Sequence, residues 1–291
     1  MASTPAAYSR EPTTVGRLIQ HWRHARKKSQ LALSLQAGIS ARHLGFVEVG
    51  RATPSREMVL LLAGALDVPL RERNALLLAA GYAPIYRETR LGAPEMEHAG
   101  KALQLILEHQ EPYPAVVMDC HWNMLTSNAG ALRFFGQLIA LPSGGPPPNI
   151  LRLMFDPEGL RPWVANWESV AEALIQRVHR EALGGIPDAA TVSLLADVLA
   201  YPGVPKRWRS PDLLSLPKPC LAVEFRKGSM AMDLFSTVTT LGTPLDVTLQ
   251  ELRIECFFPA NEQTAESVHA LKEQTSVHNG PTTNPNAPMT K

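Results

Sequence analysis

Residues 29–51, which read SQLALSLQAGISARHLGFVEVGR, decide the fold of the first part of this chain. Leu33 and Ala37 stand four positions apart, so they share one face of a helix. Gly38 suits the left-handed conformation that often follows a helix end. Ser40 suits the N-cap of a second helix. The stretch therefore predicts two short helices joined by a tight turn.

The second predicted helix has two unlike sides. Leu44, Val47 and Glu48 fall on one side, and the other side carries Ala41, Arg42, Gly45 and Phe46. A helix pair joined through a glycine-containing turn is the helix-turn-helix pattern, whose second helix lies in the DNA major groove. The alternative is an ordinary helical hairpin within an all-α domain.

The spaced positions resemble a known family, the lambda-repressor-like (Cro/C1, XRE) DNA-binding domain, over about residues 14–80. The positions that carry the resemblance are Ser29-Gln30, Leu33, Ala37-Gly38-Ile39-Ser40, Leu44, Glu48, Gly50-Arg51 and Pro54. The resemblance implies a bundle of five helices that binds duplex DNA. Lys28, Gly45 and Gly64 depart from the usual pattern, and each glycine inside a helix costs about 1 kcal/mol relative to alanine.

The resemblance also implies which residues meet DNA. Ala41, Arg42 and Phe46 stand where the family reads bases, and Arg42 is the best candidate because a guanidinium can pair bidentately with guanine. Phosphate contacts are expected from Gln30, Ser40 and Arg51. Arg23 and Glu48 match a structural ion pair between the first helix and the recognition helix.

The charge distribution agrees with a DNA-binding N-terminal part. Residues 13–90 hold 12 Lys/Arg and 5 Asp/Glu, a net charge of +7, whereas residues 91–291 hold 15 and 21, a net charge of −6. Residues 1–12 add Arg10 and Glu11, which cancel, so the sum is the overall +1. A protein that neutralises phosphates needs such a basic region.

The remaining composition narrows the class of protein. The hydrophobic fraction of 45% is that of a globular protein, and no apolar run approaches the ~18 residues of a membrane span. Cys120, Cys220 and Cys256 lack the paired spacing of a disulfide framework or a zinc site. These features predict a cytoplasmic protein with no metal site and no membrane partner.

The second half reads as an α+β domain. Short strands are expected at 115–119 and 124–127, and helices around 132–135, over a long stretch from Trp163 to Val178, and over 188–199. Period-two patterns predict three more strands, at 221–226, 230–240 and 247–258, the last with a bulge near Glu251. The sequence therefore predicts one antiparallel sheet with flanking helices.

Several stretches of this half also resemble the C-terminal domain of MmyB-like transcription regulators. They are NILRLMF at 149–155, LRPW at 160–163 with NWE at 166–168, FST at 235–237, and LGTP at 241–244 with FFP at 257–259. The resemblance implies a PAS-like module that binds a fatty-acid-like ligand, placed after a repressor-like domain.

The two resemblances together set the expected organisation. We expect a disordered tail over 1–12, the helix-turn-helix domain over 13–82, a linker and connecting helix over 83–112, the PAS-like ligand-binding domain over 113–262 and a disordered tail over 263–291. The fold class is thus α followed by α+β: a five-helix repressor-like bundle and then a PAS-like domain.

Aromatic and methionine side chains of the second domain are candidates for an apolar pocket, although most such stripes are simply core. The candidates are Phe134, Trp163, Trp167, Met230, Phe235 and Phe257. Arg161 and His121 are the nearest candidates for a ligand head group.

Three functions follow from this interpretation. The first is a dimeric, sequence-specific regulator whose PAS-like domain senses a small lipophilic molecule. The second is a regulator whose C-terminal domain serves only dimerisation or contact with a protein partner. The third, an enzyme fused to a DNA-binding domain, has no support, because the sequence lacks a Gly-rich phosphate loop, a His-Glu-x-x-His motif and a Gly-x-Ser-x-Gly motif.

Overall fold

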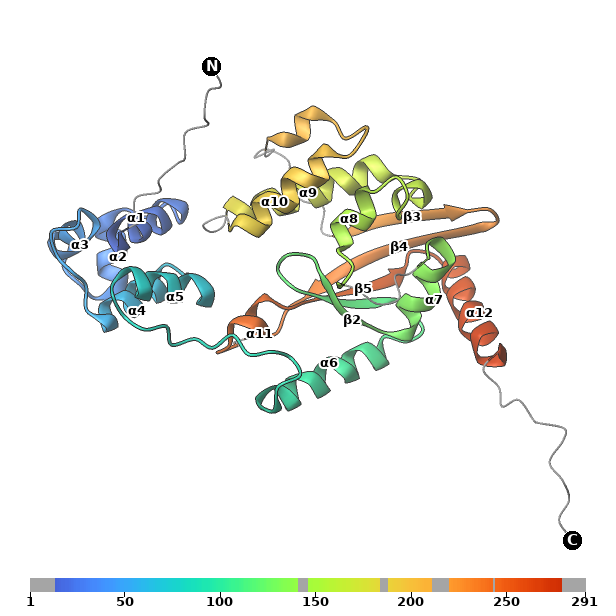
Figure 1. The fold of residues 1–291 in the computed structure, drawn as a ribbon, viewed down its shortest axis with the longest axis horizontal. Helices are drawn as coiled ribbons and strands as arrows, with labels where there is room; N and C mark the ends of the chain where they lie inside the picture. The colour runs from blue at the N-terminus through green and yellow to red at the C-terminus, as the bar shows by residue number, and fades with distance from the viewer. Residues whose placement is uncertain (1–13, 141–145, 184–187, 211–219, 243, 279–291) are drawn as a thin grey trace, which may run out of the picture. The chain divides into compact units, whose positions relative to one another are not determined.

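The computed structural model describes residues 14–140, 146–183, 188–210, 220–242 and 244–278 (Figure 1). The chain forms two compact units. The first contains the chain up to Ala93 together with Arg180–Ala189 and Gly242–Gln250, and the second contains the other residues. The expected tail over residues 1–12 lies outside the described residues.

The first unit contains the five-helix bundle that the sequence predicts. Its helices are α1 (Val15–Ala25), α2 (Gln30–Ala37), α3 (Ala41–Glu48), α4 (Arg56–Ala65) and α5 (Leu70–Ala79). Side-chain oxygens cap four of them, at Thr14, Ser29, Ser40 and Ser55. Each cap satisfies a backbone N–H that a helix start leaves without a partner.

The core of the bundle is apolar and well covered. Ile19, Trp22, Leu33, Leu44 and Leu62 are fully buried in one cluster. Full burial of one such side chain contributes about 1.5–3 kcal/mol. The apolar residues at helical spacing in the sequence are therefore the main source of the stability of the bundle.

Two departures from the family pattern have structural reasons. Lys28 directs its ammonium to the carbonyl oxygen of Ala65, at 2.7 Å, and to the side chain of Gln36, so it caps the end of α4 instead of entering the core. A Cβ at Gly45 would lie 3.7 Å from Oε1 of Gln30, an ordinary contact. Nothing near Gly64 requires a glycine there.

A later segment of the chain belongs to the same unit. The carboxylate of Asp246 accepts hydrogen bonds from Thr89, at 3.2 Å from its N–H and 2.6 Å from its hydroxyl. The N–H of Val247 donates to Arg87, at 2.8 Å. Oε1 of Gln250 accepts the N–H of Leu70, at 2.7 Å, and caps α5, whose own N-cap side chain makes no such bond.

The second unit is built on a five-stranded antiparallel sheet. The strands are β1 (Ala115–Met118), β2 (Met124–Ser127), β3 (Leu221–Lys227), β4 (Met230–Thr239) and β5 (Arg253–Pro259). Their order is β2-β1-β5-β4-β3, so the last strand in sequence lies at the centre. Gly228, at a φ of 57°, makes the tight turn between β3 and β4.

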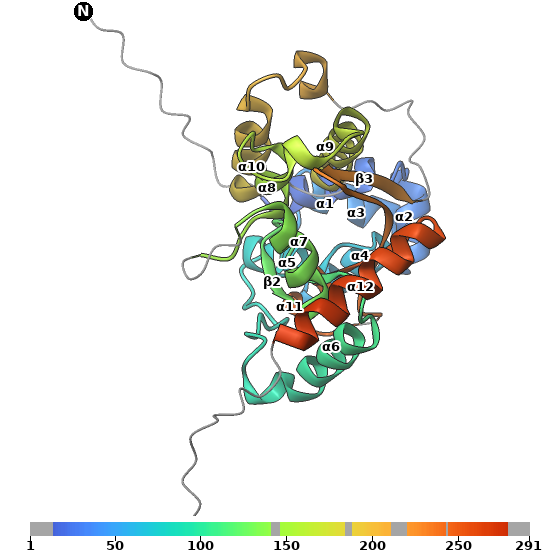
Figure 2. The same cartoon turned by 90° about the vertical axis from the view of Figure 1, so that its right-hand side faces the viewer.

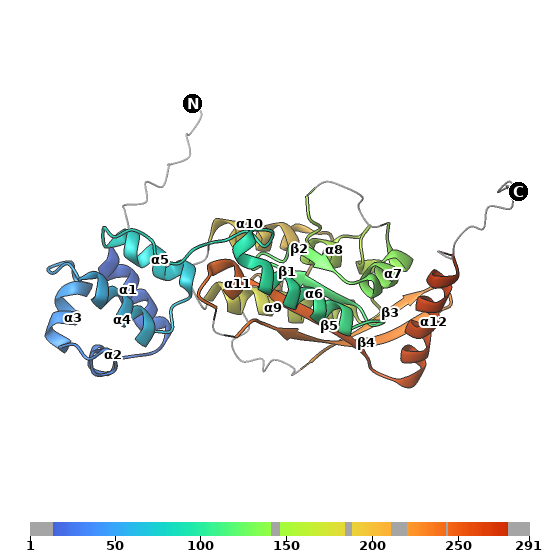
Figure 3. The ribbon, with the colours of Figure 1, turned by 90° about the horizontal axis from the view of Figure 1, so that it is seen from below.

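Helices cover both faces of this sheet. One face meets the connecting helix α6 (Glu97–His109), whereas α8 (Ile150–Phe155) and α9 (Trp167–Leu183) lie on the other side (Figure 3). The remaining helices of the unit are α7 (Ala129–Leu138), α10 (Ala189–Ala200), α12 (Glu262–His278) and three short 3-10 turns at Pro94–Met96, Arg161–Trp163 and Lys206–Arg209. The antiparallel sheet with flanking helices agrees with the predicted fold class.

One long helix is shorter than predicted. The helix expected to include Trp163 begins only at Trp167, because Arg161–Trp163 form a 3-10 turn that contains Pro162. Val164 is extended and bridges to Phe225 of β3. Trp163 and Trp167 therefore do not share one helical stripe.

The expected strand over 247–258 is also corrected. Residues Val247–Glu251 form a short helix, α11, and β5 starts at Arg253. The alternation of apolar residues shifts by one position near Glu251 because the chain changes there from helix to strand, and not because a strand contains a bulge.

The expected disordered tail over 263–291 is wrong for its first part. Residues Glu262–His278 form α12, which lies beside α7 (Figure 2). Thr264 and Val268 are buried, and the hydroxyl of Thr264 accepts the N–H of Asp233 of β4. Only a narrow stripe of α12 packs against the sheet, so the helix needs few apolar residues. Residues 279–291 lie outside the described residues.

In the part of the chain that the structure describes, no helix has the length and hydropathy needed to cross a membrane.

Candidate DNA-binding surface and ligand cavity

Helix α3 presents one exposed face and buries the other. Leu44, Val47 and Glu48 are buried, whereas Arg42 is exposed and Phe46 is half-buried. Gly38, at a φ of 67°, makes the turn into this helix. The helix pair therefore leaves the residues that the sequence assigns to base reading away from the core.

Arg42 lies along the exposed face of α3. Its guanidinium carbon is 5.5 Å from the centre of the Phe46 ring, within the range of a cation–π contact. The two residues one turn apart thus form a single surface with charged and apolar parts. Such a surface can offer hydrogen bonds to guanine and an apolar contact to a thymine methyl group.

Arg23 and Glu48 form a bidentate ion pair that ties α1 to the end of α3. Nε of Arg23 lies 2.7 Å from Oε1 of Glu48, and an NH2 nitrogen lies 2.8 Å from Oε2. The two side chains are 8% and 1% exposed. Burial by itself raises the pKa of Glu48, but hydrogen bonds from Arg23 and Gln30 and the charge of Arg23 outweigh it and hold the pKa below its usual value.

Close packing fixes the same helix from another side. Gly16 of α1 lies against the last turn of α3, and a Cβ there would stand 2.2 Å from the carbonyl oxygen of Val47. A side chain at Gly16 would therefore displace the helix. The ion pair and this glycine together set the angle of α3 relative to α1.

The expected phosphate ligands have different environments. The hydroxyl of Ser40 accepts the N–H of His43 and keeps its own hydrogen for another partner. The amide nitrogen of Gln30 donates to Glu48, at 2.8 Å, so Gln30 also supports the ion pair. Arg51 is exposed just beyond α3. Arg26, directly after α1, bonds the carbonyl oxygens of Leu66 and Asp67 just beyond α4.

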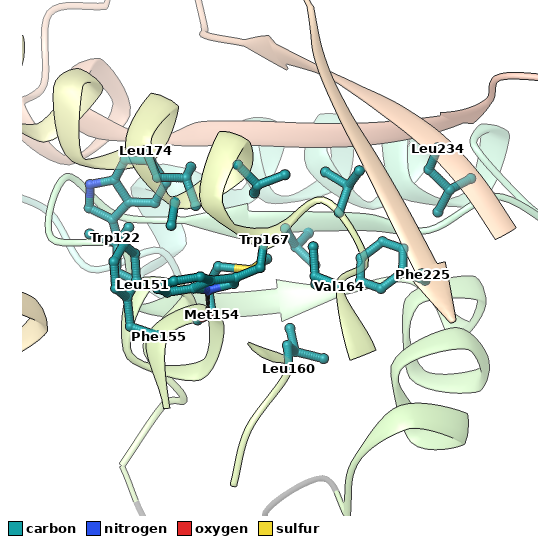
Figure 4. Close-up of a cluster of buried hydrophobic side chains, with 14 of the residues drawn as sticks. Trp122, Leu151, Met154, Phe155, Leu160, Val164, Trp167, Leu174, Phe225 and Leu234 are labelled. Carbon is teal, nitrogen blue, oxygen red and sulfur yellow. Dashed lines mark hydrogen bonds between the residues drawn. The ribbon is translucent and has the colours of Figure 1, made fainter. Parts of the chain in front are cut away.

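The second unit encloses an apolar cavity of about 50 Å³. It lies between the sheet and helices α7, α8 and α9, and Figure 4 shows the cluster of buried side chains in this region. Its lining consists of Val116, Trp122, Met124, Phe135, Ile139, Ile150, Leu153, Met154, Leu160, Val170, Leu174, Leu221, Val223, Phe225, Glu255 and Phe257. One water needs roughly 10–15 Å³ of such space, so the cavity has room for a small apolar group.

Only one of the predicted pocket residues, Phe257, is in this lining. Phe134 lies just behind it, edge-to-face against Phe135 and Phe225, which do line it. Phe235 is on the opposite face of the sheet and stacks on Phe258, with 5.5 Å between ring centres. The prediction for Phe235 fails because adjacent strand residues point to opposite faces.

The other predicted pocket residues also lie outside the lining. Trp163 meets the ammonium of Lys227, 4.6 Å from its ring centre. The indole N–H of Trp167 donates to the carbonyl oxygen of Met154, and the side chain is core. Met230 packs at the edge of the same core.

Neither predicted head-group partner reaches the cavity. The guanidinium carbon of Arg161 lies 3.9 Å from the centre of the Trp167 ring, and the same group bonds the carbonyl oxygen of Pro202. His121 is in the β1–β2 turn, where its N–H is bonded to Asp119. This turn also directs the thiol of Cys120 to Glu251, at 3.3 Å.

The sequence reasoning missed Glu255, which is the charged residue of the lining. It lies on the central strand β5, is 6% exposed, and is opposite Val116 in the ladder. Burial raises the pKa of Glu255, and a hydrogen bond from Ser236 and the charges of Arg177 and Arg253 offset this only in part. The sequence did contain a sign of this residue. Glu255 is the one charged residue between Ile254 and Phe257, in a strand that is buried on both faces.

A helix-turn-helix bundle with one exposed face on its second helix, together with a second unit that has an apolar cavity, is the arrangement expected of a ligand-responsive DNA-binding regulator. The chain belongs to the family of MmyB-like transcription regulators. Residues 99–271 match the model of the "MmyB-like transcription regulator ligand binding domain", and residues 19–73 match that of the "Helix-turn-helix". Both models describe binding modules of transcription regulators rather than enzymes.

Two solved structures show some similarity to this chain. The PAS domain of BvgS from Bordetella pertussis has a TM-score of 0.28 and 14% sequence identity, and the match covers 61% of this chain and 98% of that one. An RNA-binding light-oxygen-voltage receptor has a TM-score of 0.29 and 11% identity, with coverage of 96% and 69%. Scores this low carry no argument about function. A search of curated proteins found no match.

Proposed function

We propose that this protein is a sequence-specific transcription regulator of the cytoplasm, whose PAS-like domain senses a small lipophilic, fatty-acid-like molecule. The observation that carries the proposal is the apolar cavity in a chain that also presents an exposed recognition helix. A buried acyl chain gains about 0.8 kcal/mol per CH₂, so such a ligand needs few polar contacts. In this proposal the protein is not an enzyme and has no membrane or metal partner.

The size of the cavity limits the ligand in the conformation described. A volume of about 50 Å³ is smaller than the ~150 Å³ of an engineered cavity that admits benzene. A medium acyl chain must therefore push side chains aside. Met124 and Met154 line the cavity, and flexible methionine side chains adapt to such changes. This expansion would transmit ligand binding to the surrounding strands and helices.

The test of ligand sensing is mass spectrometry of the purified, denatured protein. We expect an extractable acyl or other apolar compound, and addition of that compound should raise the Tm of the protein. The competing function is a C-terminal domain that only dimerises or contacts a partner protein. An empty protein whose Tm no acyl compound shifts would favour that alternative.

For DNA binding, we propose a homodimer on a roughly two-fold symmetric operator. Support comes from the helix-turn-helix and from the net charge of +7 in residues 13–90 (12 Lys/Arg against 5 Asp/Glu). Affinity should fall steeply with salt, because binding releases counterions from phosphates. A footprint that covers a single asymmetric half-site, or affinity independent of salt, would contradict the proposal.

Arg42 is the proposed base reader, and Ala41 and Phe46 are its proposed apolar partners. Arg42→Ala should weaken specific DNA binding by about 1–3 kcal/mol while leaving non-specific binding nearly intact. Arg207→Ala, which removes an exposed arginine of the second unit, is the matched control. Equal losses in specific and non-specific affinity would make Arg42 a phosphate ligand, as proposed for Ser40, Gln30 and Arg51.

A further inference from the structure

We propose that the β4–β5 connection, residues Gly242–Gln250, passes changes at the cavity to the DNA-binding bundle by making or releasing the cap of α5. This role rests on the proposed function, because it assigns the regulation of that function to one segment of the chain. The connection starts and ends at strands of the second unit, yet it belongs to the first unit.

The connection joins two strands that are neighbours in the sheet. The chain leaves β4 after Thr239 and enters β5 at Arg253, and β5 carries Phe257 of the cavity lining. Only Leu252, which is fully buried, separates the end of α11 from the start of β5. Because closely packed interiors transmit strain, a shift of β5 moves α11 with it.

The bundle receives one of its helix caps from this connection. Side-chain oxygens of their own N-cap residues cap α1 to α4, whereas the N-cap of α5 is Pro69, which makes no such bond. Oε1 of Gln250 instead accepts the N–H of Leu70, from 180 positions further along the chain. The first N–H groups of a helix have no partner within it. The order of the first turn of α5 therefore depends on the position of α11.

Other hydrogen bonds hold the connection on the same unit. The carboxylate of Asp246 accepts both the N–H and the hydroxyl of Thr89. Val247 is buried, and its N–H donates to the carbonyl oxygen of Arg87. These bonds keep α11 attached to the unit while the cap of α5 is made or released.

The helix α5 is linked to the recognition helix through α1. It packs against α1, and its Leu76 and Leu77 are buried in the core of the bundle. In turn, α1 holds α3 through the Arg23–Glu48 ion pair and the close approach at Gly16. Loosening of α5 would therefore reach α3 through α1.

A second contact ties α11 to the cavity. Glu251, the last residue of α11, accepts the thiol of Cys120, at 3.3 Å. Cys120 stands in the β1–β2 turn two residues before Trp122, whose ring lines the cavity and whose φ is 67°. Few bulky residues adopt this left-handed conformation, so a ring displaced by a ligand moves the turn with it. Successive residues of α11 thus bond to different units, Gln250 to the start of α5 and Glu251 to this turn.

Both sites act on one equilibrium, between α5 with its cap and α5 with a frayed first turn. Allosteric coupling requires such a two-state element. A ligand that expands the cavity shifts β5 and the Trp122 turn, draws Gln250 away from Leu70 and favours the frayed state. By reciprocity, DNA that orders the bundle favours the capped state and weakens ligand binding.

Hydrogen exchange of the full-length protein tests this coupling without a known ligand. Val170→Phe places a ring in the cavity as a permanent occupant, and Val192→Phe is the same change at an exposed position of the second unit. We expect Val170→Phe to speed exchange of the Leu70 amide at least fivefold, and Val192→Phe to leave it unchanged. An unchanged Leu70 amide in Val170→Phe would overturn the inference. If Val170→Phe does not fold, Leu153→Phe, at another position of the lining, replaces it.

Variants of Gln250 isolate the contribution of the connection. Gln250→Ala removes the cap, so the Leu70 amide should exchange at least tenfold faster, and Val170→Phe should then add no further increase. Gln250→Glu keeps an acceptor and should restore both the slow exchange and the response to Val170→Phe. Gln20→Ala, at an exposed glutamine of α1, is the matched control. A response to Val170→Phe that persists in Gln250→Ala would show that the signal takes another route and that the inference is wrong.

DNA binding by the same variants separates this inference from the proposed function. Val170→Phe should weaken specific binding at least threefold in the unaltered background and have no effect in Gln250→Ala, because the two changes act through one contact. A purified protein without a bound apolar compound, or without specific DNA binding, would contradict the proposed function. The exchange of the Leu70 amide decides the coupling independently of both results.

Discussion

Two buried glutamates, one in each unit, have pKa values that are shifted in opposite directions. Glu48 of the bundle faces Arg23 and Gln30, and its pKa lies below the usual value. Glu255 of the ligand-binding domain is among the residues that surround an apolar cavity, and its pKa lies above the usual value because burial raises it. Burial acts in the same direction on both, so the partners decide the outcome.

The difference shows what each unit is built to do. The bundle uses its buried charge to hold the angle of α3, because a bidentate pair has little freedom of geometry. The ligand-binding domain leaves its buried acid less completely compensated, beside space that a ligand can enter. A buried polar group without full compensation is costly.

The largest expected effect comes from breaking the ion pair of the bundle. Arg23→Ala leaves Glu48 buried without its partner, and such changes cost about 3–5 kcal/mol. Hydrogen exchange of the amides in α1–α5 should show the loss, and DNA binding should weaken with it. Arg56→Ala, at an exposed arginine of the same bundle, should have little effect on exchange.

A double-mutant cycle with Glu48→Ala sharpens this result. The two losses should be strongly non-additive, because each single change removes the same interaction. Additive losses would mean that the two side chains contribute to stability independently.

An intermediate effect should come from one added methyl group in each unit. Val59 of the bundle and Val170 of the cavity lining are both fully buried. Val59→Ile should destabilise the bundle by about 1–3 kcal/mol, because a close-packed core has no room for it. Val170→Ile should be neutral or stabilising, since the methyl group can enter the cavity, and it should weaken ligand binding.

Calorimetric unfolding of both variants checks this contrast. A cost at Val170 equal to the cost at Val59 would show that the cavity region is as tightly packed as the bundle.

The smallest expected effect is the opposite pH dependence of the two acids. Because the pKa of Glu48 is lowered, its stabilisation exists above the unfolded value of about 4.5 and is lost as the pH falls through the folded pKa. Because the pKa of Glu255 is raised, the folded state loses stability as the pH rises from about 4.5 toward the folded pKa.

Glutamine variants separate these two contributions. At pH 7, Glu255→Gln should raise the free energy of unfolding of its domain by about 1 kcal/mol, and the gain should vanish below pH 4.5. Glu48→Gln should instead be destabilising at pH 7 and less so at low pH. Urea unfolding at several pH values measures both effects. If the free energies of unfolding of the two variants changed with pH in the same direction relative to the unaltered protein, the opposite pKa shifts of the two acids would be contradicted.

The bundle was predictable from sequence almost element by element. Its helices follow local signals: Ser29, Ser40 and Ser55 at N-caps, Gly38 at the turn, and apolar residues at helical spacing. The antiparallel sheet was predictable for the same reason, since strands such as Leu221–Lys227 alternate with period two.

The errors arose where distant contacts decide the structure. Thr264 and Val268 make residues 263–278 helical through contacts with the sheet that local composition does not reveal. The lining of the cavity depends on which face of a strand looks inward, which placed Phe235 wrongly and left Glu255 unnoticed.

The segment Gly242–Gln250 has a consequence for how the chain can be divided. It lies within the part that matches the ligand-binding family, yet Asp246 bonds Thr89 and Gln250 caps α5. A cut between the two family-matched regions, near residue 93, would leave these side chains without their partners and α5 without its cap. The first unit therefore cannot be cut out as one continuous stretch of chain, because part of it comes from within the region that matches the ligand-binding family.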